Sequence, residues 1–305
     1  MKTFVATLVV LLIQCTHLIA SKSCEDPESI VINVYLYNNK FPDGKNLGNQ
    51  QSCQDIDASL PVVIITHGFT SSANDDLFRN LAKAFVQKGH TALIVDWSQA
   101  ACSLLIQYPT AVENTRKIGP LIANYTIDMI NTCKTPLENM KFVGHSLGSH
   151  VCGFAAKQIK RLTNETVPTI LCLDPAKPEF GGNPCEERVC KEDTKRMVVF
   201  KTSILGISDP IGHLNLQFGN GLTQPACWFI DINCHHTESI TYATDMVDEK
   251  CLRLAVPFDA FSYPTADTQD CLVVNSNILK PDNTAVGQKY VYTDCAENTF
   301  KCKKE

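Results

Sequence analysis

The segment from Asn139 to His150 constrains the fold of this chain more than any other feature of its sequence. Apolar residues typical of a buried strand run into the pentapeptide Gly-His-Ser-Leu-Gly, and helix-forming residues follow it. A Gly-x-Ser-x-Gly turn between a strand and a helix exposes its serine above the edge of a sheet. Gly144 and Gly148 flank the turn, where a side chain would collide with neighbouring backbone. The segment therefore predicts a strand, a sharp turn and a helix, with Ser146 at the apex.

The pattern around Ser146 occurs by chance in many chains, so the surrounding sequence must decide whether this serine is catalytic. Short β-branched runs alternate with helical segments along the chain. This alternation predicts an α/β fold with a mostly parallel sheet and helices on both faces. Besides the segment above, we expect strands at residues 30–37, 61–66, 92–97, 169–174 and 197–204, and helices at residues 75–88, 110–133 with a bend at 119–120, and 146–162.

A carboxylate is predicted to lie beside the serine. Asp174 ends a predicted strand 28 residues after Ser146, a distance that fits one helix and one crossover. Parallel strands end at the same edge of a sheet, so the two side chains should meet there. A buried carboxylate can orient a catalytic histidine and stabilise its charged form. In hydrolases whose triad follows the chain order Ser, Asp, His, the base lies after the acid. This leaves His213, His235 and His236, and periodicity does not choose among them.

Ester hydrolysis also requires N–H donors for the oxyanion of its tetrahedral intermediate. One donor comes from the residue after the serine, and the other from the loop after an earlier strand. Leu147 and Phe69 hold these positions, because Phe69 follows His67-Gly68 directly after the strand at 61–66. Phe69 is also expected as a core aromatic residue, and the two roles are compatible.

Residues 1–20 contain a lysine at position 2, an apolar run and small residues near position 20, which is typical of a signal peptide. We therefore expect a secreted, soluble protein in which residues 21–305 form one domain, since no linker or repeat divides them. The sequons at Asn124 and Asn164 are candidate glycosylation sites. The net charge of −5 gives no reason to expect nucleic acid as a partner.

The cysteines favour an oxidising compartment. Fifteen cysteines less Cys15 in the predicted leader leave fourteen, an even number that suits disulfides. Their spacing does not require a metal, and we expect no cofactor. Two pairings that close short loops are expected first, Cys185 with Cys190 and Cys227 with Cys234. Two cysteines on elements that should face the core, Cys152 and Cys172, are expected to be buried thiols.

Six blocks of the sequence occur in the order seen in the animal pancreatic lipase family. They are His-Gly-Phe at 67–69, Val-Asp-Trp at 95–97, Ala-Val-Glu-Asn-Thr-Arg at 111–116, Gly-His-Ser-Leu-Gly-Ser-His at 144–150, Leu-Asp-Pro-Ala at 173–176 and Cys-His-His-Thr at 234–237. The chain resembles this family over most of residues 21–305, and within it the venom phospholipases A1 of wasps and hornets.

The resemblance implies a catalytic triad of Ser146, Asp174 and His236, because its Cys-x-His pattern favours His236 over His235. It also suggests a disulfide between Cys24 and Cys102. The chain departs from the family at two positions. Lys177 stands where the family usually has glycine, and His235 doubles the histidine.

The resemblance further implies an α/β-hydrolase fold, without the C-terminal β-sandwich domain of pancreatic lipases, for which the chain is too short. In this family a lid lies between two cysteines upstream of the base, and here only six residues separate Cys227 from Cys234. A lid this short implies a phospholipase A1, which cleaves the sn-1 acyl ester of phosphoglycerides at a membrane or micelle surface. We expect a monomer without a required protein partner. The alternatives are a triacylglycerol or galactolipid lipase and a non-catalytic, lipid-binding relative of the yolk-protein type.

The short loop carries Trp228, Phe229 and Ile230 in succession. Tryptophan favours the head-group zone of a membrane, where its ring is half buried and its N–H stays hydrated. We therefore expect the loop to contact lipid rather than to cover the site. The alternative is that these three side chains fill the core beneath the site.

Overall fold

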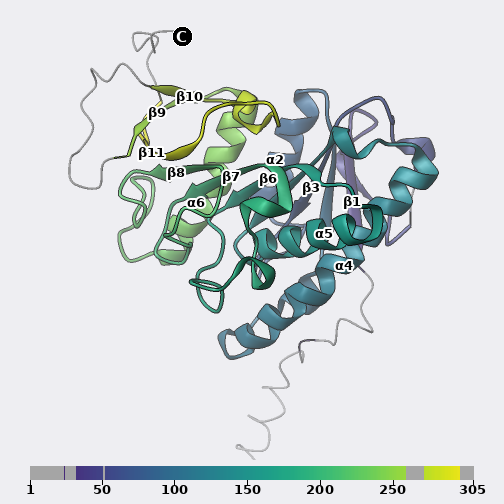
Figure 1. Cartoon of the computed structure of the whole chain (residues 1–305), viewed down its shortest axis with the longest axis horizontal. Coiled ribbons are helices and arrows are strands. Elements are labelled where there is room, and N and C mark those ends of the chain that lie inside the picture. The colour runs from purple at the N-terminus through teal and green to yellow at the C-terminus, as the bar shows by residue number, and fades with distance from the viewer. Residues whose placement is uncertain (1–23, 25–31, 51, 259–270, 296–305) are drawn as a thin grey trace, which may run out of the picture.

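The computed structural model describes residue 24 and residues 32–50, 52–258 and 271–295 (Figure 1). The predicted leader at residues 1–20 lies outside the described residues, as does Cys302. No helix of the described ranges is long and apolar enough to cross a membrane.

One mixed sheet of eleven strands organises the described chain, in the order β10-β9-β11-β8-β7-β6-β5-β3-β4-β1-β2. The strands are β1 (Asn33–Asn38), β2 (Phe41–Asn46), β3 (Val62–Thr66), β4 (Thr91–Asp96), β5 (Met140–His145), β6 (Val167–Leu173), β7 (Thr194–Lys201), β8 (Leu214–Phe218), β9 (Arg253–Pro257), β10 (Leu272–Val274) and β11 (Gly287–Val291). The strands from β4 to β11 in this order pair in parallel, and antiparallel pairs extend the sheet at both edges. The prediction of a mostly parallel sheet is confirmed.

Helices cover both faces of the sheet, as predicted (Figure 1). The α-helices are α2 (Asp76–Gln87), α3 (Ser98–Ala101), α4 (Tyr108–Cys133), α5 (Leu147–Thr163) and α6 (Ile232–Asp248), and the 3-10 helices are η1 (Cys53–Asp55), η2 (Leu105–Gln107), η3 (Leu137–Asn139), η4 (Cys185–Glu187), η5 (Lys191–Asp193) and η6 (Ser276–Leu279). Helices α4 and α5 pack in the core on one face, and α2 and α6 pack in the core on the other.

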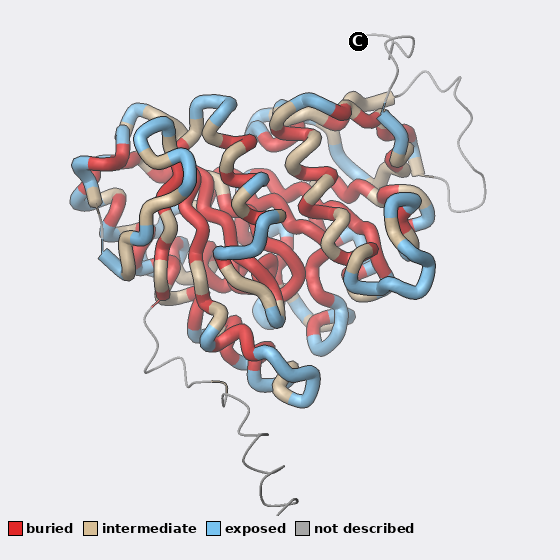
Figure 2. The backbone as a smooth tube through the Cα atoms, turned by 180° about the vertical axis from the view of Figure 1, so that it is seen from behind, coloured by how far each residue is buried: buried red, intermediate tan, exposed pale blue. Residues whose placement is uncertain are grey.

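Strand β3 shows why the central strands are apolar along their whole length. Successive side chains of a strand point to opposite faces of the sheet. Ile64 joins the core under α4 and α5, whereas Val63 and Ile65 join the core under α2 and α6. All residues of β3 are buried, and Figure 2 shows buried backbone through the middle of the molecule.

Most predicted elements agree with the structure to within one to three residues. Strand β7 is shifted by three residues, since it begins at Thr194 rather than at the first apolar residue, Met197. Buried polar side chains account for the earlier start, because Thr194 donates to the carbonyl of Val167 and Arg196 donates to the carbonyl of Ile278. The predicted strand at 30–37 overlaps β1 at 33–38, and its residues 30 and 31 lie outside the described residues. Helix α4 continues through Pro120 without interruption.

The structure contains all three disulfides for which both partners were predicted, Cys24–Cys102, Cys185–Cys190 and Cys227–Cys234. Five bridges are described in full: Cys24–Cys102, Cys53–Cys133, Cys185–Cys190, Cys227–Cys234 and Cys251–Cys295. Cys271 is also disulfide-bonded. Cys152 and Cys172 are buried free thiols, as predicted. By loop-closure entropy, a bridge that spans 80 residues, such as Cys53–Cys133, stabilises the fold by about 3–5 kcal/mol.

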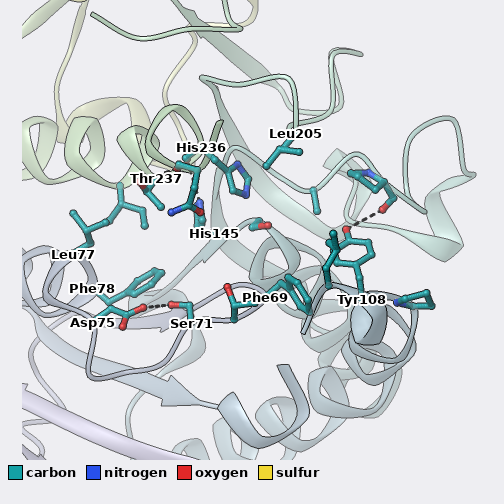
Figure 3. A pocket seen from close by; sticks show the side chains of 18 residues that line it. Phe69, Ser71, Asp75, Leu77, Phe78, Tyr108, His145, Leu205, His236 and Thr237 are labelled. Atoms are coloured by element: carbon teal, nitrogen blue, oxygen red, sulfur yellow. Dashed lines mark hydrogen bonds between the residues drawn. The ribbon is translucent and has the colours of Figure 1, made fainter. Parts of the chain in front are cut away.

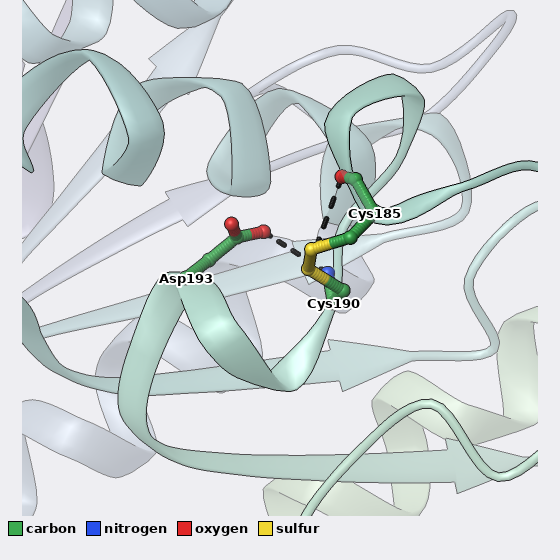
Figure 4. Close-up of side chains that lie close together, drawn as sticks. All are labelled: Cys185, Cys190 and Asp193. Atoms are coloured by element: carbon green, nitrogen blue, oxygen red, sulfur yellow. Dashed lines mark hydrogen bonds between the residues drawn. A yellow bond between two sulfur atoms is a disulfide. The ribbon is translucent and has the colours of Figure 1, made fainter. Parts of the chain in front are cut away.

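One disulfide lies beside a carboxylate in an arrangement that resembles a metal site (Figure 4). Cys185 and Cys190 are bonded to each other, so neither offers a thiolate. Asp193 accepts from the N–H of Cys190 at 3.0 Å and pairs with the ammonium of Lys157 at 2.6 Å. These partners account for the cluster without a metal ion.

Candidate active site

Ser146 lies at a strained turn between β5 and α5. Its backbone has φ 55° and ψ −123°, a conformation that L-residues rarely adopt outside such turns. A Cβ at Gly144 would overlap the carbonyl of Gly148, and one at Gly148 would overlap the carbonyls of Thr66 and His67. Both glycines are therefore required by close backbone contact, as predicted.

Asp174 and His236 form a hydrogen-bonded pair beside this turn. Asp174 directly follows β6, and its Oδ2 accepts from Nδ1 of His236 at 2.7 Å. The carboxylate is fully buried. Burial alone would raise the pKa of Asp174, but the hydrogen bond from His236, the electrostatic interaction with its ring and the charge of Lys201 lower it below its usual value. The carboxylate thus stays ionised beside the imidazole.

His236 is held near the start of α6 by local structure. The side chain of Asp231 caps this helix by accepting from the N–H of Cys234 at 2.9 Å. The disulfide Cys227–Cys234 fixes the same turn, two residues before His236. The ring presents Nδ1 to Asp174, and the side chain lines the same cavity as Ser146.

A second serine, Ser203, touches the Asp174–His236 pair. Its hydroxyl donates to Oδ2 of Asp174 and lies 3.4 Å from Nδ1 of His236. The N–H groups of Thr202 and Ser203 donate to Oδ1 of Asp174 at 2.8 and 3.3 Å. Ser203 is fully buried and lies on the Nδ1 side of the imidazole, so it orients the carboxylate and is badly placed to attack a substrate. Sequence reasoning missed this residue.

The other two candidate histidines have different roles. Nδ1 of His213 accepts from the N–H of Met197 at 2.9 Å, and His213 is not among the residues that line the cavity at Ser146. Nδ1 of His235 accepts from the N–H of Gln224 at 2.9 Å, and its Nε2 lies 3.2 Å from the carbonyl of Phe229. Of these three histidines, His236 alone is bonded to Asp174.

His145 lies against the ring of His236, with 4.4 Å between the ring centroids. Its Nε2–H donates to the carbonyl of His236 at 3.2 Å. Burial lowers the pKa of His145 to about 3, and the charge of His236 acts in the same direction. His145 is therefore neutral at physiological pH and adds no positive charge next to the base.

Phe69 and Leu147 lie next to Ser146, as the oxyanion prediction requires. Gly68 precedes Phe69, and a Cβ built on it would lie 2.7 Å from the Cβ of Ser146. Leu147 is the first residue of α5, where a backbone N–H has no partner within the helix. The donor roles themselves stay a prediction.

A cavity of about 530 Å³ opens at Ser146 and His236 (Figure 3). Its wall is largely apolar and includes Phe69, Tyr108, Leu205 and Ile240. Figure 3 shows His236 and Phe69 on different sides of the cavity. The volume and lining suit an acyl chain whose carbonyl end lies at the serine.

The loop between Cys227 and Cys234 is exposed. The exposed fractions are 81% for Trp228, 80% for Phe229 and 69% for Ile230. The alternative that these side chains fill the core is therefore wrong.

A second exposed apolar tip, which sequence reasoning missed, lies at Leu105 and Ile106 in η2, with exposed fractions of 82% and 87%. Leu105 also lines the cavity, so this tip lies at its mouth.

Comparisons with known proteins identify the family of this chain. A family model described as Lipase matches residues 13–281. The chain is 52% identical to a phospholipase A1 of Solenopsis invicta, with complete coverage of both chains. It is 37% identical to a phospholipase A1 of Dinoponera quadriceps, over 90% of this chain and 78% of the relative. It is also 38% identical to a phospholipase A1 of Vespula maculifrons, over 67% of this chain and 71% of the relative.

Proposed function

This chain belongs to the lipase family, and on that premise we propose that it is a phospholipase A1. It hydrolyses the sn-1 acyl ester of phosphoglycerides to a 2-acyl lysophospholipid and a fatty acid. The observation that carries this proposal is the bonded Asp174–His236 pair at an apolar cavity that Ser146 also lines. An intact set of these three groups disfavours the non-catalytic alternative, because a lipid-binding protein has no need of them.

We assign the chemical roles as follows. Nε2 of His236 takes the proton of the Ser146 hydroxyl while Oγ attacks the ester carbon. The N–H groups of Phe69 and Leu147 stabilise the oxyanion. When the intermediate collapses, the lysophospholipid oxygen leaves with the proton from His236, and the acyl group stays on Ser146. Water, activated by the same histidine, then releases the fatty acid. Asp174 keeps the proton of the imidazole on Nδ1 and stabilises the imidazolium.

The short loop from Cys227 to Cys234 supports a phospholipid rather than a triglyceride as the substrate. A loop of six residues closed by a disulfide cannot cover a cavity of this size. A polar head group can therefore remain in water while the acyl chain enters the cavity. The direct test compares hydrolysis of phosphatidylcholine with that of triolein. Faster hydrolysis of triolein would favour the triacylglycerol lipase instead.

Asp174→Asn should reduce kcat by about 10⁴-fold, because an amide can hold the imidazole in the wrong tautomer. Asp209→Asn is the matched control. Asp209 follows β7, where many α/β-hydrolases keep their acid, but here it is exposed, and the described residues around His236 include only Asp174 as its carboxylate partner. Steady-state hydrolysis of a dissolved short-chain ester measures both effects. An equal loss in the two variants would show that the acid is misassigned.

Trp228→Ser/Phe229→Ser should weaken binding to phosphatidylcholine vesicles by about tenfold or more, because each large apolar side chain moved out of water contributes roughly 1.5–3 kcal/mol when fully buried. Turnover of a dissolved ester and the melting temperature should hardly change, since both side chains are exposed in the free protein. The wild-type protein should begin to hydrolyse vesicles without a lag, because its short loop does not cover the cavity.

Leu162→Ser provides the control for this loop. Leu162 is 52% exposed near the end of α5, at the opposite end of that helix from Ser146. Its replacement should leave vesicle binding intact. A large drop in melting temperature for the double variant, with both substrates equally affected, would contradict lipid contact by the loop.

We also propose that the protein is secreted as a monomer, with residues 1–20 as its signal peptide and residues 21–305 as one catalytic domain. The five described disulfides support export, because such bridges persist in oxidising compartments. Both predicted sequon asparagines, Asn124 and Asn164, are exposed, as glycan acceptors must be.

A further inference from the structure

His67 is a fully buried histidine close to the active site that has no part in the mechanism above. It directly follows β3 and precedes Gly68 and Phe69. Its Nδ1 lies 3.0 Å from the carbonyl oxygen of Gly68, and its Nε2 lies 3.1 Å from the backbone nitrogen of Trp97. Both ring nitrogens therefore face backbone groups, and these two contacts define the state of the ring.

The proton position on His67 follows from its partners. A carbonyl oxygen only accepts, so Nδ1 must carry a proton and donate it to Gly68. The N–H of Trp97 only donates, so Nε2 accepts in this contact. The carboxylate of Asp96 lies 3.5 Å from Nε2. If it drew a second proton onto the ring, Nδ1 would still donate to Gly68, so this hydrogen bond exists in either charge state.

The carbonyl of Gly68 belongs to the same planar peptide unit as the N–H of Phe69. In a trans unit the two groups point in opposite directions, and this peptide bond is trans. Holding the carbonyl against the buried ring of His67 therefore turns the N–H of Phe69 away from the ring. Ser146 borders this peptide unit, since a Cβ built on Gly68 would lie 2.7 Å from the Cβ of Ser146.

We propose that His67 is a positioning residue that aims the N–H of Phe69 at the oxyanion of the reaction. This inference rests on the proposed function, because it needs an oxyanion at Ser146. His67 touches no substrate. It acts by restricting rotation of the one peptide unit that carries the donor, so that the donor is oriented before charge develops.

His67 is itself rigidly held. Its ring stacks on Trp97 with 5.5 Å between centroids and 17° between the planes. Nε1–H of Trp97 donates to the carbonyl of His67 at 2.9 Å. The same carbonyl lies where a Cβ on Gly148 would clash, so the backbone of His67 rests directly on the turn that carries Ser146. The donor loop and the nucleophile thus share one support.

Two substitutions separate orientation from packing. In His67→Gln the amide reaches the position of Nε2 and can accept from Trp97, but the hydrogen bond to Gly68 is lost. In His67→Asn the amide nitrogen reaches the position of Nδ1 and can still donate to Gly68. Both variants lose the stacking on Trp97, so they are matched for the loss of the ring.

The assay uses p-nitrophenyl butyrate, which needs no lipid surface, and a long-chain alkyl trifluoromethyl ketone as a probe of the oxyanion site. Oγ of Ser146 adds to the ketone carbon, the C=O π pair moves to oxygen, and the hydroxyl proton passes to His236. The adduct therefore places an anionic oxygen where the oxyanion forms. Its inhibition constant reports the donors independently of turnover.

We expect His67→Gln to lose roughly 10- to 100-fold in kcat, a part of the 10²- to 10³-fold effect of removing a donor, with KM nearly unchanged. The affinity for the ketone should fall by a similar factor. His67→Asn should lose less than about fivefold in each quantity, although both variants melt at a lower temperature. If both variants lose equal activity, or if His67→Gln binds the ketone as the wild type does, His67 is only a packing residue.

Two further outcomes are also decisive. If His67→Gln does not fold, a folded His67→Asn variant decides alone. A loss of more than tenfold in its affinity for the ketone would overturn the inference, and retained affinity would support it. If the wild type neither hydrolyses the ester nor binds the ketone, the proposed function fails, and this inference with it. A working wild type with two equal variants removes the role of His67 alone.

Discussion

Ser146→Ala is expected to reduce ester hydrolysis by 10⁴-fold or more, because loss of a triad nucleophile removes the covalent route altogether. The fold should remain intact, since the variant removes one hydroxyl that makes almost no packing contact. Steady-state rates on phosphatidylcholine and on a dissolved ester should fall together. Diisopropyl fluorophosphate should label the wild type at Ser146 and leave the variant unlabelled.

Ser203→Ala is the matched control for this prediction. It removes a buried hydroxyl that donates to Asp174, so we expect a loss of about tenfold and normal labelling of Ser146. If Ser146→Ala kept more than about a tenth of the wild-type rate, the nucleophile would be misassigned. A dead Ser203→Ala variant with an active Ser146→Ala variant would move that role to Ser203.

His236→Ala should lose activity as severely as Ser146→Ala, because no other described side chain joins Asp174 to the cavity as an acid–base group. His235→Ala should keep substantial activity. The adjacent histidine points away from the carboxylate and accepts from the N–H of Gln224, so its loss should lower the melting temperature without removing the base. Rates per folded molecule, with the folded fraction measured by circular dichroism, separate these two effects. If His235→Ala were the inactive variant, the base would be His235 and the assignment of His236 would be one residue too late.

The sequence predicted those parts of the site that depend on local pattern. The turn at Ser146 follows from two glycines at fixed spacing, and the place of Asp174 follows from the length of one helix and one crossover. His236 could not be chosen by the same reasoning, because the local sequence pattern does not distinguish it from His213 and His235. Only resemblance favoured one of them, and the contact at 2.7 Å between His236 and Asp174 agrees with that choice.

The features that sequence reasoning missed depend on tertiary contact. Ser203 lies 29 residues after Asp174 and becomes its partner only because β7 pairs beside β6. The exposed tip at Leu105 and Ile106 has the composition of a core segment, and composition carries no sign of exposure. The bridge Cys53–Cys133 was not predicted, because fourteen cysteines allow too many pairings for spacing to choose.

The two buried thiols affect how the protein reaches its oxidised form. Disulfide exchange requires a thiolate, and burial raises the pKa of Cys152 to about 12 and that of Cys172 well above its usual value. At pH 7 both thiols are therefore almost entirely protonated. Once β6 and α5 have packed, neither sulfur can attack a neighbouring bridge at a useful rate. Formation of the core therefore ends disulfide reshuffling by these two cysteines, and the completed pairings are protected by kinetics as well as by their equilibrium stability.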